Sequence, residues 1–352
     1  SNLRANFEIA QNEAENKKKR LIQNIIIIGL GIILLLAIGL VTLYYTSLRR
    51  SKKLTAALEE RRILLEKQSA ELKEKNEKII SANEELQRLY EVSNSQKEEI
   101  ISSINYAQRI QEAILPPEAY ITELITENFV LYKPKDIVSG DFYWIKQINH
   151  YIILACADCT GHGVPGAFMS MLGISYLNEI IRRKEITQAN QVLNELRSVI
   201  KHSLRQSGKK GKSRDGINMA LCVIDTANNT MQYAGAYHPL YLISNTGAEP
   251  ELKEFKADTM PVGVHFAGDK AFSNHEIKLG IGDTFYLFTD GFTDQDGGDN
   301  GSRLGTDRLK KLLMDIYDQP MYEQKDILEQ TLDEWMGEHP QRDDILVIGA
   351  RV

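Results

Sequence analysis

Several acidic side chains in this sequence stand at the tips of apolar, strand-like runs. They are Asp141, Asp158, Asp290 and Asp343, with Asp344 beside the last. Asp158 ends the run 151–157 and opens the glycine-rich turn Cys-Thr-Gly-His-Gly. Asp-Gly pairs are ordinary turn residues, and one such aspartate would mean little. Four with the same placement predict a shared site.

Gathered carboxylates lose hydration and repel one another, so such a site is unfavourable unless cations neutralise it. Mg²⁺ and Mn²⁺ prefer oxygen ligands, and neighbouring glycines let backbone carbonyls and waters complete the octahedral shell. Two such ions about 3.5 to 4 Å apart can activate a water for in-line attack on phosphorus. The pattern therefore predicts phosphoester hydrolysis at a two-metal centre.

The cysteines offer a competing interpretation as a redox or zinc motif, because Cys156 and Cys159 are separated by two residues. Cys222 is the only other cysteine, and no histidine-rich segment accompanies them. We therefore expect three reduced, buried thiols in a cytoplasmic domain.

The chain has 352 residues, 43% of them hydrophobic, and a net charge of -6. This length suffices for one large domain with additional segments. No basic stripe with interleaved aromatic residues occurs, and the cluster at residues 209–212 is too short to be one, so nucleic-acid binding is not expected. We interpret that cluster as a mobile loop.

Residues 25–45 contain no charged side chain and would extend roughly 31 Å as a helix, which matches a bilayer core. They predict a single-pass transmembrane helix in the cell (inner) membrane, preceded by a polar juxtamembrane segment, residues 1–24. The stretch is too long for the apolar part of a signal peptide. Basic residues flank both ends, so charge does not orient it; the cytoplasmic placement rests on the thiols and on phosphoprotein substrates. Because the chain begins Ser1-Asn2 without methionine, we expect an upstream sensor domain to be missing.

Residues 46–94 carry a seven-residue repeat without proline or glycine. Its apolar positions are Leu58, Leu65, Leu72, Ile79 and Leu86. The facing positions are polar and include Asn76 and Asn83, a pattern typical of a weakened parallel coiled coil. We expect a homodimer through residues 54–114, with a solvated single helix as the alternative.

Residues 95–117 form a linker with a broader apolar face. Its members are Ile101, Ile104, Ala107, Ile110 and Ile114, and Pro116-Pro117 follow as a helix stop. We expect this face to pack on the globular domain, residues 118–352. Our hypothesis is that this helix carries a signal to that domain.

The globular part alternates helices with runs of antiparallel strands, which predicts an α+β layered sandwich. We expect strands at 129–132, 142–148, 151–157, 217–225, 230–237, 240–244, 285–289 and 345–352, with further strands before Asp283 and with turns at 228–229 and 245–247. Helices are expected near 164–183, 187–207, 303–317 and 321–336.

The ordered motifs of this region resemble those of SpoIIE-type PPM (PP2C-like) serine/threonine phosphatases. The motifs are Ser139-Gly140-Asp141-Phe-Tyr, Ala157-Asp158-Cys159-Thr160-Gly161-His162-Gly163, Gly282-Asp283, Thr289-Asp290-Gly291 and Arg342-Asp343-Asp344. Ala234-Gly-Ala-Tyr-His-Pro239 also looks like that family. The resemblance covers about residues 95–352.

The resemblance implies an α-β-β-α sandwich with two Mn²⁺ or Mg²⁺ ions between the sheets. By motif, Asp158 would bridge the ions and the Cys159 carbonyl would ligate one of them. Asp141, Asp290 and Asp343 would supply the other carboxylates, with Asp344 behind them or as an occasional ligand. The implied activity is hydrolysis of phosphoserine or phosphothreonine on a partner protein such as an anti-sigma antagonist.

The roles of two histidines, His162 and His238, are not decided by the motifs. In the eukaryotic branch of the family, a proposed general acid lies two residues after the bridging aspartate, whereas His162 lies four after Asp158. His162 therefore either caps the helix, shapes the turn or takes part in catalysis. His238, before Pro239, is interpreted as structural.

Three rival functions were weighed. A histidine kinase is excluded because no histidine precedes His150. A nucleotide cyclase has no evident need for carboxylates at both Asp290 and Asp343. A catalytically inactive scaffold of the same fold remains the alternative.

Overall fold

The computed structural model describes residues 2–184, 188–206, 215–244, 249–265, 268, 270–298 and 300–352. The expected loop at 209–212 and the turn at 245–247 lie outside these residues. The chain divides into two compact units, Ser1–Ser95 and Gln96–Val352, which are described separately.

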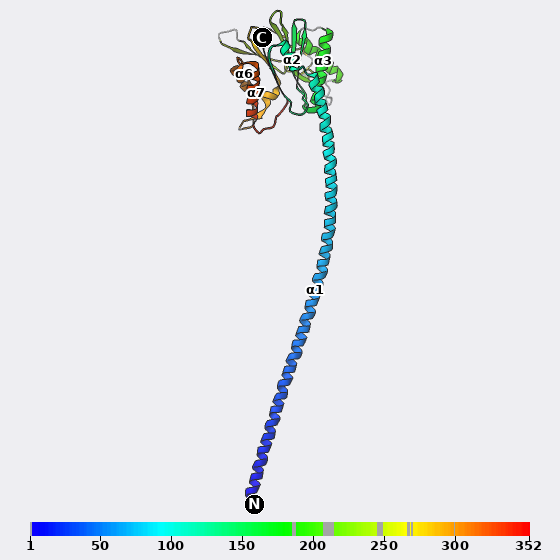
Figure 1. Cartoon of the computed structure of the whole chain (residues 1–352), viewed down its shortest axis with the longest axis vertical. Helices are drawn as coiled ribbons and strands as arrows, with labels where there is room; N and C mark the ends of the chain where they lie inside the picture. Colours follow the sequence, from blue (N-terminus) through cyan, green and yellow to red (C-terminus); the bar gives the residue numbers. More distant parts are fainter. Residues whose placement is uncertain are drawn as a thin grey trace. The chain divides into compact units, whose positions relative to one another are not determined.

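The first unit consists of the greater part of the long helix α1 (Asn2–Ile114) (Figure 1). It contains an 18-residue window of mean hydropathy 3.0, so by length and composition this helix is apolar enough to span a membrane. The leucines of the seven-residue repeat are exposed, for example Leu65 and Leu72. Ion pairs one turn apart, such as Arg62 with Glu66, line the surface of this stretch.

The second unit is built on two five-stranded antiparallel sheets. The first sheet has the order β1 (Glu127–Lys133), β12 (Ile345–Arg351), β9 (Thr284–Phe288), β6 (Leu240–Ser244) and β7 (Glu251–Phe255). The second has the order β2 (Phe142–Ile148), β3 (Tyr151–Cys159), β4 (Ile217–Asp225), β5 (Thr230–Ala236) and β8 (His275–Lys278). A short hairpin joins β10 (Asp296–Gly297) to β11 (Ser302–Arg303).

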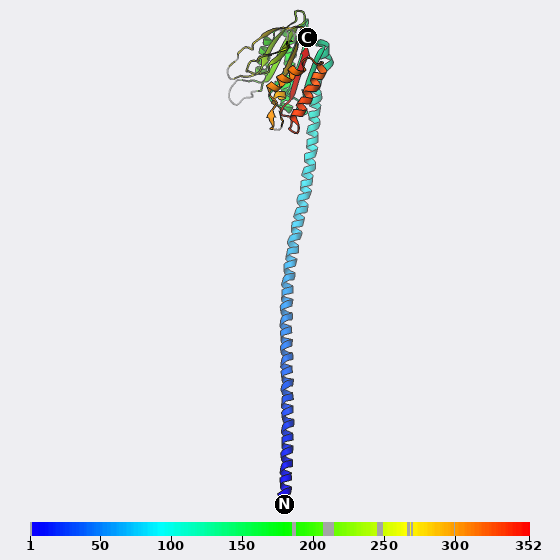
Figure 2. The ribbon, with the colours of Figure 1, turned by 90° about the vertical axis from the view of Figure 1, so that its left-hand side faces the viewer.

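Helices cover the outer face of each sheet. They are α3 (Gly163–Lys184) and α4 (Ala189–Ser203) on the second sheet, and α6 (Thr306–Ile316) and α7 (Met321–Met336) on the first. Figure 1 shows α6 and α7 on one side of the strands and α3 on the other, and Figure 2 shows α6 and α7 in front of the strands. The short helices α2 (Glu118–Leu124) and α5 (Asp290–Asp294) complete the unit. The predicted α-β-β-α sandwich is confirmed.

The apolar runs at the centre of the sandwich follow from burial on both faces. Along β3, Ile153 and Ala155 belong to the cluster under α3 and α4, whereas Ile152 and Leu154 belong to the cluster between the sheets. A strand covered on both faces gains from apolar residues at every position, because successive side chains point to opposite faces. That is why this run carries no polar residue until Asp158 at its tip.

The prediction of which side chains of residues 95–117 pack on the globular domain is wrong in part. Helix α1 ends at Ile114, before the two prolines as predicted, but Ile101, Ile110 and Ile114 are 38 to 39% exposed. The side chains that turn inward are those of Ile104, Ala107, Gln111 and Leu115, of which Gln111 is 4% exposed. The amide group of a buried glutamine needs hydrogen-bond partners. The hydrogen bonds of Gln111, and not the packing of the isoleucines, therefore determine which face of the helix turns inward.

Candidate metal centre

Asp141 and Asp158 lie at the same edge of the second sheet because of strand register. Phe142 pairs with Ala157 in the β2–β3 ladder, so the residues just beyond them, Asp141 and Asp158, stand opposite each other. On the other side of β3, Asp158 pairs with Asn218 of β4, whose Nδ2 donates to Asp158 Oδ2 at 3.1 Å.

The other carboxylates come from the first sheet. Asp290 follows the end of β9 and begins α5, and Asp343 and Asp344 precede the start of β12. These two strands are antiparallel neighbours, with Phe288 opposite Val347, so both tips lie at one edge.

Two hydrogen bonds join this edge to the second sheet. Thr289 Oγ1 donates to Asp141 Oδ2 at 2.6 Å, and the backbone N–H of Gly140 donates to Asp344 Oδ2 at 2.7 Å. Asp344 also accepts the backbone N–H of Lys135 through Oδ1 at 2.8 Å. Asp344 therefore uses both oxygens to hold the backbone that leads to Asp141.

Burial and neighbouring negative charges raise the pKa values of three carboxyl groups, those of Asp141, Asp158 and Asp290. Burial, and next the charge of Asp158, raise the pKa of Asp141 well above its usual value. Burial, followed by the charges of Asp290 and Asp343, raises the pKa of Asp158 from 3.8 to about 8. Loss of hydration, then Asp294 and Asp343, raise the pKa of Asp290, which lies at the exposed mouth of the site. The four predicted aspartates thus share one electrostatic environment.

This donor set fits hard divalent cations. The raised pKa values mean that uncompensated negative charge is unfavourable here, and cations would relieve it. Backbone oxygens crowd the same place: a Cβ on Gly140 would lie 2.7 Å from Gly161 O and 3.3 Å from Cys159 O. Glycine at 140 therefore leaves room beside the Cys159 carbonyl that was expected to be a ligand.

Within the described part of the chain, no three His, Cys, Asp or Glu side chains form a group that could hold a metal ion. Each carboxylate is instead engaged separately, Asp141 with Thr289 and Asp158 with Asn218. Mg²⁺ commonly keeps several waters and takes only one or two carboxylates from a protein, so paired rather than triple ligation suits it.

His162 has a partner that the sequence did not reveal. Its Nδ1 lies 2.6 Å from Asp136 Oδ2, and both side chains are about half exposed, at 49% and 47%. Asp136 follows Lys135, whose backbone N–H is bonded to Asp344, so the pair stands at the rim of the carboxylate cluster.

The long helix reaches this site through Gln111. Gln111 Nε2 donates to Ser139 O at 2.6 Å and to Ser170 Oγ at 2.9 Å, and Gln111 Oε1 accepts the Ser139 backbone N–H at 3.1 Å. Ser139 Oγ in turn accepts the backbone N–H of Asp141 at 3.0 Å. One glutamine of α1 thus holds the loop that presents Asp141.

Sequence reasoning missed Asn218 and Gln111, although both left a signal. Asn218 is a polar residue at the start of β4, which is apolar from there to its last residue, Asp225. Gln111 lies seven residues after Ile104 and four after Ala107, on the apolar side of its helix. A single polar residue on a buried face predicts a specific hydrogen bond.

The thiols are as predicted, because Cys156, Cys159 and Cys222 are free and buried. Burial raises the pKa of the Cys159 thiol well above its usual value, so its sulfur is not a ready ligand. Any contribution of Cys159 to an ion therefore comes from its carbonyl oxygen.

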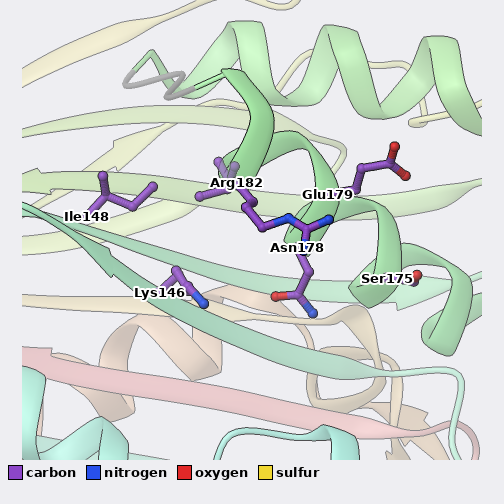
Figure 3. Close-up of a pocket in the computed structure, with 7 residues that line it drawn as sticks. Lys146, Ile148, Ser175, Asn178, Glu179 and Arg182 are labelled. Carbon is purple, nitrogen blue, oxygen red and sulfur yellow. The ribbon is translucent and has the colours of Figure 1, made fainter.

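A hollow of about 710 Å³ lies elsewhere (Figure 3). It is lined by Lys146 and Ile148 of β2 and by Ser175, Asn178, Glu179, Ile181 and Arg182 of α3. These are the ends of β2 and α3 farthest along the chain from Asp141 and His162. The hollow is therefore not the carboxylate site.

Comparisons with known proteins agree with this geometry. The model of the Stage II sporulation protein E (SpoIIE) family matches residues 149–352. The chain belongs to the SpoIIE family. It is similar to the SiaA-PP2C domain of Pseudomonas aeruginosa, with 35% identity and a TM-score of 0.64 over 73% of this chain and 98% of that chain. The resemblance drawn from the motifs is confirmed.

The SpoIIE fold is also shared with a more distant structure. The PP2C phosphatase domain of SpoIIE from Bacillus subtilis, solved with a fragment of its regulatory domain, has 17% identity and a TM-score of 0.52. That match covers 64% of this chain and 63% of the other, and shows the fold alone. No match was found among curated proteins.

Proposed function

We propose that this chain is a metal-dependent protein serine/threonine phosphatase that hydrolyses phosphoserine or phosphothreonine on a partner protein. The supporting observation is that acidic strand tips of two sheets lie at one edge, where the Thr289 hydroxyl donates to Asp141. PP2C-type domains are generally phosphatases of this class and use Mg²⁺ or Mn²⁺, and the cluster here has the matching chemistry.

Two Mn²⁺ or Mg²⁺ ions would be held by Asp141, Asp158, Asp290, Asp343 and the Cys159 carbonyl. When bound, the ions would supply an activated water and neutralise charge that develops on the phosphoryl group. Asn218 and Thr289 orient the Asp158 and Asp141 carboxylates. Asp344 fixes the Gly140 backbone, so the ligands are held before substrate arrives.

His162 is the proposed proton donor to the leaving serine or threonine oxygen. Its Nδ1 is bonded to Asp136, which orients the ring and leaves Nε2 for the substrate. The proton passes from Nε2 to the leaving oxygen as the phosphorus–oxygen bond breaks.

The membrane and partner assignments complete the proposal. We place the phosphatase domain on the cytoplasmic side of a cell membrane spanned once by α1, with phosphorylated partner proteins such as an anti-sigma antagonist as substrates. A homodimer through residues 54–114 would cover the exposed leucines of α1 and the exposed Ile110 and Ile114.

The test uses the full chain in detergent with Mn²⁺. It should hydrolyse a phosphoserine protein and p-nitrophenyl phosphate, Asp290→Asn should abolish both activities, and Asp326→Asn on the exposed side of α7 should change neither. His162→Asn should lower turnover of the phosphoserine protein much more than that of p-nitrophenyl phosphate, whose leaving group needs no proton. Equal turnover in excess chelator would refute the metal mechanism, and an inactive wild-type chain would favour the scaffold. Equal loss on both substrates in His162→Asn would refute the proton-donor role.

A further inference from the structure

His238 lies in the connection that leads from β5 of the second sheet to β6 of the first. Its backbone N–H donates to Ala236 O at 2.8 Å, which closes a three-residue turn around Tyr237. Tyr237 has φ of 62°, a left-handed conformation that is strained for a bulky residue. Such strain persists only where the surroundings enforce it, and it often marks functional sites.

The contacts around this turn hold the backbone of His238 in one place. Tyr237 N–H donates to Asp258 O at 2.9 Å, and the Tyr233 hydroxyl donates to His238 O at 2.5 Å. The His238 side chain is only 5% exposed. The strained turn therefore directs the imidazole into the interior.

The buried ring ends beside the metal centre. His238 Nε2 has no hydrogen-bond partner among the described residues, and lies 3.9 Å from Asp158 Oδ2. The same carboxylate oxygen accepts the Asn218 amide at 3.1 Å. A histidine that served packing alone would have its ring nitrogens paired, because an unpaired buried polar atom is unfavourable.

We propose that His238 is a positioning residue for the metal centre: its Nε2–H joins the Asn218 amide on Oδ2 of Asp158 and fixes how that carboxylate meets the ions. The proposal rests on the proposed function, since it assigns this histidine a role only if Asp158 holds metal. The gap of 3.9 Å exceeds a hydrogen bond by about 1 Å, which a small rotation of the carboxylate covers. Partners behind metal ligands orient them in this way, and their loss commonly weakens metal binding about 10- to 100-fold.

The test measures Mn²⁺ binding by the full chain in detergent, using calorimetry and the electron paramagnetic resonance signal of free Mn²⁺. We expect His238→Leu to weaken binding about 10- to 100-fold. His238→Gln, which keeps an N–H donor, should recover part of this loss. The matched control is His275→Leu, because His275 of β8 stacks on the same Tyr233, at 5.7 Å between ring centroids, and should leave binding unchanged.

A second measurement separates positioning from packing. In chelator, the thermal midpoint of His238→Leu should equal or exceed that of the wild type, because the variant removes a buried unpaired atom. Tyr237→Gly keeps the histidine but relaxes the turn that aims it, so it should also weaken Mn²⁺ binding without lowering the midpoint in chelator.

Several results would overturn the proposal. One is Mn²⁺ affinity within twofold of wild type in Tyr237→Gly and in each His238 variant that folds. Another is an equal loss of affinity in the Leu and Gln variants with a lowered midpoint in chelator, which would show a packing role. Nitrogen coupling to bound Mn²⁺ in pulsed resonance spectra would show direct ligation instead. If the wild-type chain bound no Mn²⁺ at all, the proposed function would fail together with this inference.

Discussion

Replacing Asp158 with asparagine is expected to stabilise the ion-free protein at neutral pH while it removes Mn²⁺ binding. Burial, then Asp290 and Asp343, raise the pKa of Asp158 from 3.8 to about 8. A carboxyl group with a higher pKa in the folded state binds its proton more tightly there. Its contribution to stability is therefore complete below the unfolded value and is lost as the pH rises through the folded value.

The size of this effect on stability follows from the single proton that Asp158 keeps in the folded state. Between about pH 4 and pH 8 the folded state binds one proton more than the unfolded state. The free energy of unfolding therefore falls by about 1.4 kcal/mol for each unit by which the pH rises. From 3.8 to pH 7 this amounts to about 4 kcal/mol at most. The Asp158 side chain is 21% exposed, so we expect solvent screening to reduce the effect to about 2 kcal/mol.

The assay is urea unfolding of the full chain in detergent and excess chelator, from pH 5 to pH 8. Fluorescence reports on the second unit alone, because the two tryptophans of the chain are Trp144 and Trp335. Wild type should lose stability as the pH rises, Asp158→Asn should lose less, and Asp326→Asn should follow the wild type. With saturating Mn²⁺ the order should reverse, since only a chain that binds the ion is stabilised by it. A variant that is less stable than wild type at pH 7 in chelator would refute the reasoning.

Two further predictions concern α1. Gln111→Leu removes the hydrogen bond to the backbone N–H of Ser139 and leaves the Ser139 carbonyl only the longer bond from Ser170 Oγ, at 3.4 Å. The variant should therefore lower stability by about 1 to 3 kcal/mol and reduce turnover, whereas Gln87→Leu on the exposed part of α1 should do neither. Unchanged turnover and stability would argue against a role of this linker in the site. Under mild oxidation, Leu72→Cys should form a disulfide between two copies faster than Glu74→Cys, because Leu72 lies at an apolar position of the seven-residue repeat. The native cysteines are buried and should not interfere. Equal disulfide yields in the two variants would contradict the coiled-coil register.

The strand-tip aspartates were predictable because burial on both faces makes central strands continuously apolar. The first polar residues then mark the edge of the sheet, as Asp158 does for β3 and Thr289-Asp290 do for β9. The order of the longer helices and strands followed from the same periodicity. The edge strand β7 was covered only by the expectation of further strands before Asp283, without bounds, because its sequence Glu-Leu-Lys-Glu-Phe is mostly charged and exposed.

Contacts between segments far apart in the sequence could not be predicted in this way. The pairing of His162 with Asp136, 26 residues earlier, depends on how two loops approach each other at the rim of the site. The rotation of α1 was misjudged for a related reason. Counting apolar residues favoured Ile110 and Ile114, whereas the hydrogen bonds of Gln111 to a loop 28 residues later decide which face turns inward.

The way the central carboxylates are held favours a cation site over a structural ion-pair network. Among the ion pairs of the described residues, Asp141 has no basic partner, and Asp158 has only the distant Nε2 of the buried His238, whose pKa burial lowers to about 4. Their hydrogen-bond donors are the neutral Thr289 and Asn218. Arginine side chains pair instead with peripheral carboxylates, such as Arg342 with Asp296 at 2.6 Å. A network that served stability alone would neutralise its buried charges with such partners. Carboxylates kept together by neutral donors, at a cost in ion-free stability, leave the negative charge of the site to be balanced by bound cations.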